Sequence, residues 1–200
     1  MELIRCFIAI ELPEELKVRL KQLEDQLKSA RQSDIKWVDP YSIHLTLKFL
    51  GDVAAGKIAE ITEAMQEAVK GMPPFCLETR ELGAFPNLRR VQVVWLGIGG
   101  ELDKLNQLQK SIETNLEIIG FAPEARAFTA HLTLARFREH ASFGERQAFA
   151  EALTKTKFEP VCPFTVESIR VMKSQLTPQG AIYSRIGSVA LNKPLSTASL

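Results

Sequence analysis

Apolar runs typical of strands alternate along this chain with stretches in which leucine recurs every three or four positions. The segment IRCFIAIEL at 4–12 is almost continuously apolar and rich in β-formers, which predicts a buried strand. Pro13 ends it, and an amphipathic helix follows with Leu16, Leu20, Leu23, Leu27 and Ala30 on its inner face. The pattern then predicts a short strand before Pro40, a strand from His44 to Gly51, a helix over about 55–70 and a strand at 75–85.

The second half of the chain repeats this order of elements. We expect strands and helices at 91–98, 102–119, 127–137, 144–153 and 162–172, with Gly120 closing the first helix. The tetrapeptide HLTL occurs at 44–47 and again at 131–134, so that its histidines lie 87 positions apart. An internal duplication explains the matching order and the matching offset, and it predicts two lobes about a pseudo-twofold axis.

The rest of the chain adds one hairpin. KSQLTPQGAIYSRIGSVAL predicts two strands joined at Pro178 and Gly180. We therefore predict one two-lobed domain over 1–192, with repeat halves at about 4–85 and 90–173 and a hairpin at 168–190, before a flexible tail at 193–200.

Composition narrows the class of protein. The chain has 200 residues, 46% of them hydrophobic, and a net charge of +1. This near-neutral charge argues against a broad basic surface that binds duplex nucleic acid. It does not argue against a small basic pocket that binds one RNA end. Three scattered cysteines without a CxxC pair indicate reduced thiols. No signal peptide or bilayer-spanning apolar stretch is apparent, so we expect a cytoplasmic protein without membrane contact.

The HLTL tetrapeptides carry the candidate chemistry. Strand side chains alternate between faces, so His44 and Thr46 point one way while Leu45 and Leu47 point into the core. The same holds for His131 and Thr133 in the second copy. Two facing imidazoles can donate and accept a proton near neutral pH, and two hydroxyls can bind phosphate oxygens. This set suits cleavage of a phosphodiester, and a strained 2′,3′-cyclic phosphate in particular.

The histidines have two other interpretations, a structural role and a zinc site. A single histidine in a strand is more often structural, but two of the three histidines at matched places of a duplicated frame favour catalysis. A zinc site usually needs three or four ligands, and neither tetrapeptide contains Cys, Asp or Glu. We therefore expect no metal at this site.

These motifs resemble the two-histidine phosphoesterase superfamily, which carries paired His-x-Thr/Ser-x motifs. The chain is most similar to its RNA 2′,3′-cyclic phosphodiesterase branch, historically called 2′-5′ RNA ligase. The resemblance covers about 4–190 and rests on HLTL, supported by RCFIAIELP, WVDPYSIHLTLKFLGDV, RRVQVVWLGI, FTAHLTLARF and LTPQGAIYSRI. It implies an α+β, bilobal fold in which antiparallel sheets line a central cleft and helices pack outside.

The resemblance also implies an activity and residue roles. It implies hydrolysis of an RNA terminal 2′,3′-cyclic phosphate to a 2′-phosphate without metal or cofactor, with reversible 2′-5′ ligation. His44 corresponds to the proton donor and His131 to the acceptor, with Thr46 and Thr133 on the phosphate. The expected partner is an RNA 3′ end or a nucleoside 2′,3′-cyclic phosphate, bound by a monomer. Alternatives are a sister activity on ADP-ribose cyclic phosphate or 2′,5′-oligoadenylate, or a non-catalytic RNA-binding module.

Two basic residues near the motifs are candidate substrate contacts. Lys48 continues the His44 face under strict alternation and could steer phosphate. Arg136 matches a basic residue that similar proteins carry after the second motif, yet strict alternation puts it on the face opposite His131, unless a bulge returns it. We expect core packing for Trp95, and exposed loop positions for His140, Arg89 and Arg90.

Overall fold

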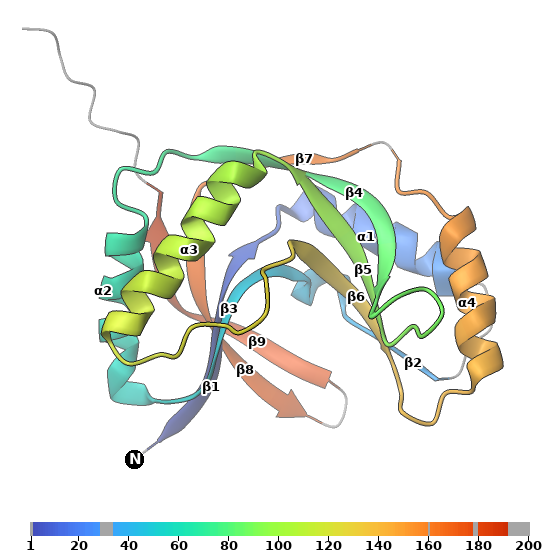
Figure 1. The fold of residues 1–200 in the computed structure, drawn as a ribbon, viewed down its shortest axis with the longest axis horizontal. Helices are drawn as coiled ribbons and strands as arrows, with labels where there is room; N and C mark the ends of the chain where they lie inside the picture. The colour runs from blue at the N-terminus through green and yellow to red at the C-terminus, as the bar shows by residue number, and fades with distance from the viewer. Residues whose placement is uncertain (1, 29–33, 160, 178–179, 192–200) are drawn as a thin grey trace, which may run out of the picture.

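The computed structural model describes residues 2–28, 34–159, 161–177 and 180–191, which form four α-helices and one nine-stranded sheet (Figure 1). The elements are β1 (Leu3–Glu11), α1 (Glu14–Lys28), β2 (Ile35–Trp37), η1 (Pro40–Ser42), β3 (His44–Ala54), η2 (Ala55–Lys57), α2 (Ile58–Ala68), β4 (Phe75–Phe85), β5 (Val93–Gly100), α3 (Leu102–Ile118), β6 (His131–Phe137), α4 (Phe143–Lys155), β7 (Pro163–Val166), β8 (Ser168–Thr177) and β9 (Gly180–Ala190). Most predicted elements are thereby confirmed, but the single strand expected at 162–172 is wrong: it is divided at Glu167 into β7 and β8, which pair with different strands of the sheet. Ala30, the turn residue Pro178 and the tail at 193–200 lie outside the described residues.

The sheet is antiparallel and symmetric in its strand order. The order is β7-β4-β5-β6-β3-β1-β8-β9, with β2 paired to β6 away from this path. The two HLTL strands, β3 and β6, meet at the centre, and β1 and β5 flank them on either side. The sheet curls so that one face is concave (Figure 1), which confirms the expected α+β fold with a pseudo-twofold arrangement.

The two lobes are not the two halves of the chain. β4 ends the first half but pairs with β5 and β7 of the second, while β8 ends the second half and pairs with β1 of the first. The halves therefore exchange a strand. The first lobe contains β3, β1, β8 and β9, and the second contains β6, β5, β4 and β7.

The helices cover the convex face of the sheet. α2 and α3 pack against each other over the first lobe, and α1 and α4 lie over the second (Figure 1). The predicted inner faces are confirmed, because Leu16, Leu20, Leu23 and Leu27 of α1 and Leu105, Ile112 and Leu116 of α3 are buried, whereas Leu102 is exposed. Within the described ranges, no helix combines the length and the apolar character needed to cross a bilayer.

Candidate active site

The paired HLTL motifs face each other across the middle of the sheet. Leu45 of β3 is the register partner of Leu132 of β6, which sets His44 opposite Thr133 and His131 opposite Thr46 in this antiparallel pair. The four motif leucines, Leu45, Leu47, Leu132 and Leu134, are buried in the core. The two histidines and two threonines are half-buried and line one cavity of about 300 Å3 on the concave face. The structure thus brings together the four residues that the sequence singled out.

Both imidazoles are held in the same way. His44 Nδ1 lies 2.8 Å from the carbonyl oxygen of Ser42, and His131 Nδ1 lies 2.7 Å from that of Thr129. A carbonyl only accepts, so each Nδ1 carries the proton and donates it. Each Nε2 is then the nitrogen that can take or give a proton in the cavity.

Aromatic rings brace each histidine, and sequence periodicity did not reveal them. The His44 ring stacks on Phe7 at 4.5 Å between centroids and meets the edge of Tyr183 at 5.0 Å. The His131 ring meets Phe85 edge-on at 4.9 Å. Phe7 lies in a strand that is apolar on both faces, so alternation gave no sign that this side chain faces the cavity.

The electrostatic surroundings of the two histidines differ. Burial lowers the pKa of His44, while the Ser42 hydrogen bond and the carboxylate of Glu11 act in the opposite direction. Burial also lowers the pKa of His131, where the Thr129 hydrogen bond opposes the shift and the charge of Arg136 adds to it. The His44 imidazole is therefore near the carboxylate of Glu11, and the His131 imidazole is near the guanidinium of Arg136.

Glu11 is the register partner of His44, and two arginines hold its carboxylate. Arg170 Nε donates to Glu11 Oε2 at 3.0 Å, and Arg185 Nη2 donates to the same oxygen at 2.6 Å. The position matched to Glu11 in the second half is Gly97, the register partner of His131. The duplication thus keeps the histidines but not their electrostatic partners.

A β-bulge in each HLTL strand determines on which face of the sheet the two candidate substrate contacts, Lys48 and Arg136, lie. Ile8 pairs with Lys48 and Ala9 with Thr46, which leaves Leu47 as an extra residue of β3. In the second half Val94 pairs with Ala135 and Trp95 with Thr133, which leaves Leu134 extra in β6. Side chains directly beyond each of these bulges are therefore on the face opposite to the one that strict alternation predicts, until a second register shift at Leu50 in β3.

For Arg136 the bulge restores the cavity face, and this side chain lines the cavity. The bulge in β3 turns Lys48 away from the cavity face, so the prediction that Lys48 contacts substrate is wrong. Lys48 is buried, and its ammonium lies 2.5 Å from Glu113 Oε2 of α3 and 2.9 Å from the Ala122 carbonyl. Phe49, the position matched to Arg136, lines the cavity in the first half instead.

The structure also places the other residues that the sequence singled out, namely Trp95, His140, Arg89 and Arg90. Trp95 is not in the core as expected, because its register partner Thr133 places it on the concave face, where it is half-buried against Phe85. His140 is exposed and lies 3.0 Å from Asp34 Oδ1. Arg89 and Arg90 are exposed in a turn, as predicted.

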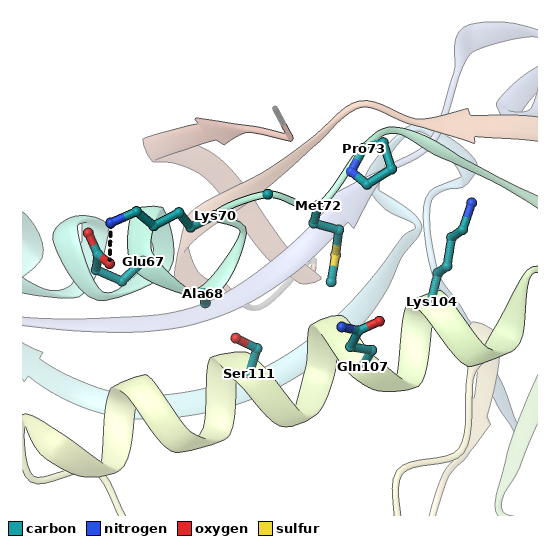
Figure 2. Close-up of a pocket in the computed structure, with 9 residues that line it drawn as sticks. Glu67, Ala68, Lys70, Met72, Pro73, Lys104, Gln107 and Ser111 are labelled. Carbon is teal, nitrogen blue, oxygen red and sulfur yellow. Dashed lines mark hydrogen bonds and ion pairs between the residues drawn. The ribbon is translucent and has the colours of Figure 1, made fainter. Parts of the chain in front are cut away.

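A second hollow, of about 190 Å3, lies between the end of α2 and α3 (Figure 2). Its lysines are paired, Lys70 with Glu67 and Lys104 with Glu101, and it shares no residue with the cavity of the histidines. Among the described residues, no three His, Cys, Asp or Glu side chains are grouped as metal ligands. The cavity lined by the two HLTL histidines is therefore the candidate active site.

The curled sheet and the doubled histidine–threonine pair define a phosphoesterase of the two-histidine class. The LigT like Phosphoesterase family matches this chain twice, over residues 10–95 and 98–183, and the chain belongs to this family. The paired match also agrees with the internal duplication.

Similar proteins cover nearly the whole chain. An RNA 2′,3′-cyclic phosphodiesterase of Methanothermobacter thermautotrophicus is 35% identical over 90% of this chain and 95% of its own length. One from Aeropyrum pernix is 36% identical over 86% of this chain and 94% of its own length. A crystal structure of E. coli LigT complexed with 3′-AMP superposes with a TM-score of 0.72, at 23% identity, over 96% of this chain and all of the other.

Proposed function

We propose that this protein hydrolyses the terminal 2′,3′-cyclic phosphate of RNA to a 2′-phosphomonoester. The observation that carries this proposal is the pair of imidazoles in one cavity, each with Nδ1 bonded to a backbone carbonyl and Nε2 left for proton transfer. Relatives that cover nine-tenths of the chain carry the name RNA 2′,3′-cyclic phosphodiesterase, which supports the same substrate class.

We assign the acid to His44 and the base to His131. The carboxylate of Glu11 favours the imidazolium form of His44, whereas the guanidinium of Arg136 favours the neutral form of His131. His131 Nε2 then takes a proton from water as the water oxygen attacks phosphorus. His44 Nε2 gives its proton to the departing 3′ oxygen, so that the phosphate stays on the 2′ oxygen.

The remaining polar side chains of the cavity bind the phosphate. Thr46 and Thr133 lie opposite the histidines across the strand pair. Their hydroxyl groups can donate hydrogen bonds to the non-bridging phosphate oxygens, where negative charge develops. Arg136 lines the same cavity and supplies a permanent positive charge. The assignment needs no metal, and EDTA is expected to leave the rate unchanged.

We also propose a cytoplasmic, monomeric enzyme. One chain supplies every residue assigned above, and the three cysteines, Cys6, Cys76 and Cys162, are free thiols. Burial, with Asp52 adding to it, raises the pKa of Cys6 to about 11, so this cavity-lining thiol stays protonated at neutral pH. Size-exclusion chromatography with light scattering tests the monomer.

Product analysis tests the proposed reaction directly. Incubation with adenosine 2′,3′-cyclic phosphate is expected to yield only the 2′-phosphate, with or without EDTA, as resolved by phosphorus NMR or chromatography. Formation of the 3′-phosphate would contradict the assigned roles, because it requires that the 2′ oxygen leaves. No turnover with either a cyclic mononucleotide or an oligonucleotide ending in a cyclic phosphate would refute the proposed function.

The asymmetry between Glu11 and Arg136 predicts opposite effects on the pH profile. kcat/KM should be bell-shaped, because the acid must be protonated and the base neutral in the free enzyme. Glu11→Gln removes a charge that raises the His44 pKa, so the alkaline limb should move to lower pH. Arg136→Gln removes a charge that lowers the His131 pKa, so the acidic limb should move to higher pH.

Initial rates with a cyclic mononucleotide from pH 4.5 to 8.5 measure both limbs. Arg138→Gln, an exposed arginine at the end of β6, is the matched control and should leave the profile in place. If Glu11→Gln moved the acidic limb instead, the donor and acceptor would be exchanged.

A further inference from the structure

The cavity of the two histidines extends into the first lobe, where a second arginine, Arg5 of β1, lines it. The pairing of β1 with β8 reaches Cys6 and Lys173, so the next residues on the two strands, Arg5 and Ser174, are neighbours. Ser174 is in turn the register partner of Tyr183 in β9, and all three side chains line the cavity. One guanidinium therefore lies close to two hydroxyl groups in this part of the cavity.

The guanidinium of Arg5 is exposed and has no ion-pair partner. Within the ranges that the structure describes, no carboxylate lies within ion-pair distance of it, although its register partner in β3 is Asp52. Two other arginines of this lobe, Arg170 and Arg185, both bond to the carboxylate of Glu11. The first lobe thus neutralises two of its arginines and leaves the charge of Arg5 open to the cavity.

Aromatic rings connect Arg5 to the reacting centre. The Phe7 ring stacks on His44 at 4.5 Å between centroids and meets the edge of Tyr183 at 5.2 Å. Arg5 follows Phe7 on the same face of β1, about 7 Å along the strand. Burial raises the pKa of Tyr183, while the charges of Arg136 and Arg5 act in the opposite direction, so both guanidiniums are within electrostatic reach of this one phenol. The free charge of Arg5 is therefore separated from His44 by a distance that the sugar of one nucleotide can span.

The roles of the histidines determine which part of the substrate enters the first lobe. His44 protonates the departing 3′ oxygen, so the C3′ atom of the ribose lies on the His44 side of the phosphorus atom. C3′ is bonded to C4′, which carries C5′ and the phosphate that joins the terminal nucleotide to the rest of the RNA. This 5′-phosphate therefore extends past His44 into the first lobe, away from His131, where water attacks.

We propose that Arg5, with the hydroxyl groups of Ser174 and Tyr183, binds the phosphate on the 5′ side of the terminal nucleotide; this rests on the proposed function of the cavity. A guanidinium and two hydroxyls supply charge-assisted and neutral hydrogen bonds to the phosphate oxygens. A nucleoside 2′,3′-cyclic phosphate lacks this group and leaves the charge of Arg5 unused. The subsite therefore makes the end of an RNA chain a better substrate than the isolated cyclic nucleoside.

Three substrates that differ in this phosphate test the subsite. Adenosine 2′,3′-cyclic phosphate lacks it, the 5′-phosphorylated form of this nucleotide carries it as a monoester, and the dinucleotide ApA with a terminal cyclic phosphate carries it as a diester. For the wild type, kcat/KM should be at least tenfold higher with both phosphorylated substrates. The gain should appear mainly in KM, because the 5′-phosphate takes no part in the reaction.

Charge variants assign this preference to Arg5. Arg5→Gln should reduce the ratio of kcat/KM between phosphorylated and unphosphorylated substrates to less than threefold. Asp52→Asn should raise the ratio several-fold, because it removes the carboxylate of the register partner. Lys110→Gln, an exposed charge on α3, is the control and should leave the ratio unchanged. A preference for the dinucleotide that persists in Arg5→Gln would come from its second nucleoside and would overturn the subsite.

Binding of the products separates the subsite from the proposed function. Isothermal titration calorimetry compares adenosine 2′,5′-bisphosphate with adenosine 2′-phosphate, and the wild type should bind the bisphosphate at least tenfold more tightly, with the difference lost in Arg5→Gln. Equal Kd values for the two ligands would overturn the subsite even if hydrolysis is intact. A wild type that prefers the bisphosphate through Arg5 but hydrolyses none of the three cyclic phosphates would refute the proposed function and leave the subsite supported.

Discussion

Replacement of His131 by Ala is expected to lower kcat on adenosine 2′,3′-cyclic phosphate by ~10²–10⁴-fold, the usual contribution of a positioned general base. Replacement of His44 by Ala should cost a similar factor, because both proton transfers occur at the same phosphorus atom. The double variant should lose little more than either single variant, since residues that act as a unit are not additive. Steady-state rates under saturating substrate measure all three.

His140 provides the control, because it is the third histidine of the chain and lies exposed beside Asp34. His140→Ala should keep kcat within twofold. The catalytic variants should retain the far-UV spectrum of the wild type, since each ring is half-buried at the cavity and its hydrogen bond is to a carbonyl of its own strand end. Equal activity of His131→Ala and His140→Ala would eliminate two-histidine catalysis.

The fold was largely readable because hydrophobic periodicity is strong in α1, α2 and α3, although it is weak in α4. Leucines at alternating steps of four and three located α1, and the same spacing located α3 in the second half. The repeat of HLTL with one offset then joined two local patterns into one symmetric arrangement. The exchange of β4 and β8 was not readable, because periodicity within a strand does not specify its partner.

The site was predicted where alternation holds and missed where it breaks. His44 with Thr46 and His131 with Thr133 lie before the bulges, so a period of two placed all four correctly. Beyond the bulges the same rule exchanged the faces of Lys48 and Arg136 relative to the structure. One extra residue reverses the side chains that follow it up to the next register shift, and no residue type in HLTLKF or HLTLAR signals it.

The ion pair at the first bulge predicts the largest loss of stability. The Lys48 side chain is 2% exposed and that of Glu113 is 15% exposed. Glu113 Oε1 also accepts from Gln109 at 3.0 Å, and its Oε2 accepts from the Glu124 backbone N–H at 3.3 Å. The pair thus connects β3 to α3 and to the segment that precedes β6.

Lys48→Met should lower the free energy of unfolding by about 3–5 kcal/mol, because it leaves the Glu113 carboxylate buried beside an apolar chain. Urea denaturation at pH 7 measures this loss. Lys48→Met combined with Glu113→Leu should recover most of it, since no unpaired charge remains. Lys57→Met, on an exposed lysine near the start of α2, is the control and should change stability by less than about 1 kcal/mol.

The same variant separates the two interpretations of Lys48. If the lysine steered phosphate, Lys48→Met would raise KM for the cyclic phosphate and leave stability unchanged. The buried pair predicts the reverse, with KM within about threefold of the wild type at a temperature where the variant is folded, because the ammonium is bonded to α3 and the Ala122 carbonyl. The bulge at Leu47, which turns Lys48 away from the histidines, is the physical reason for this expectation.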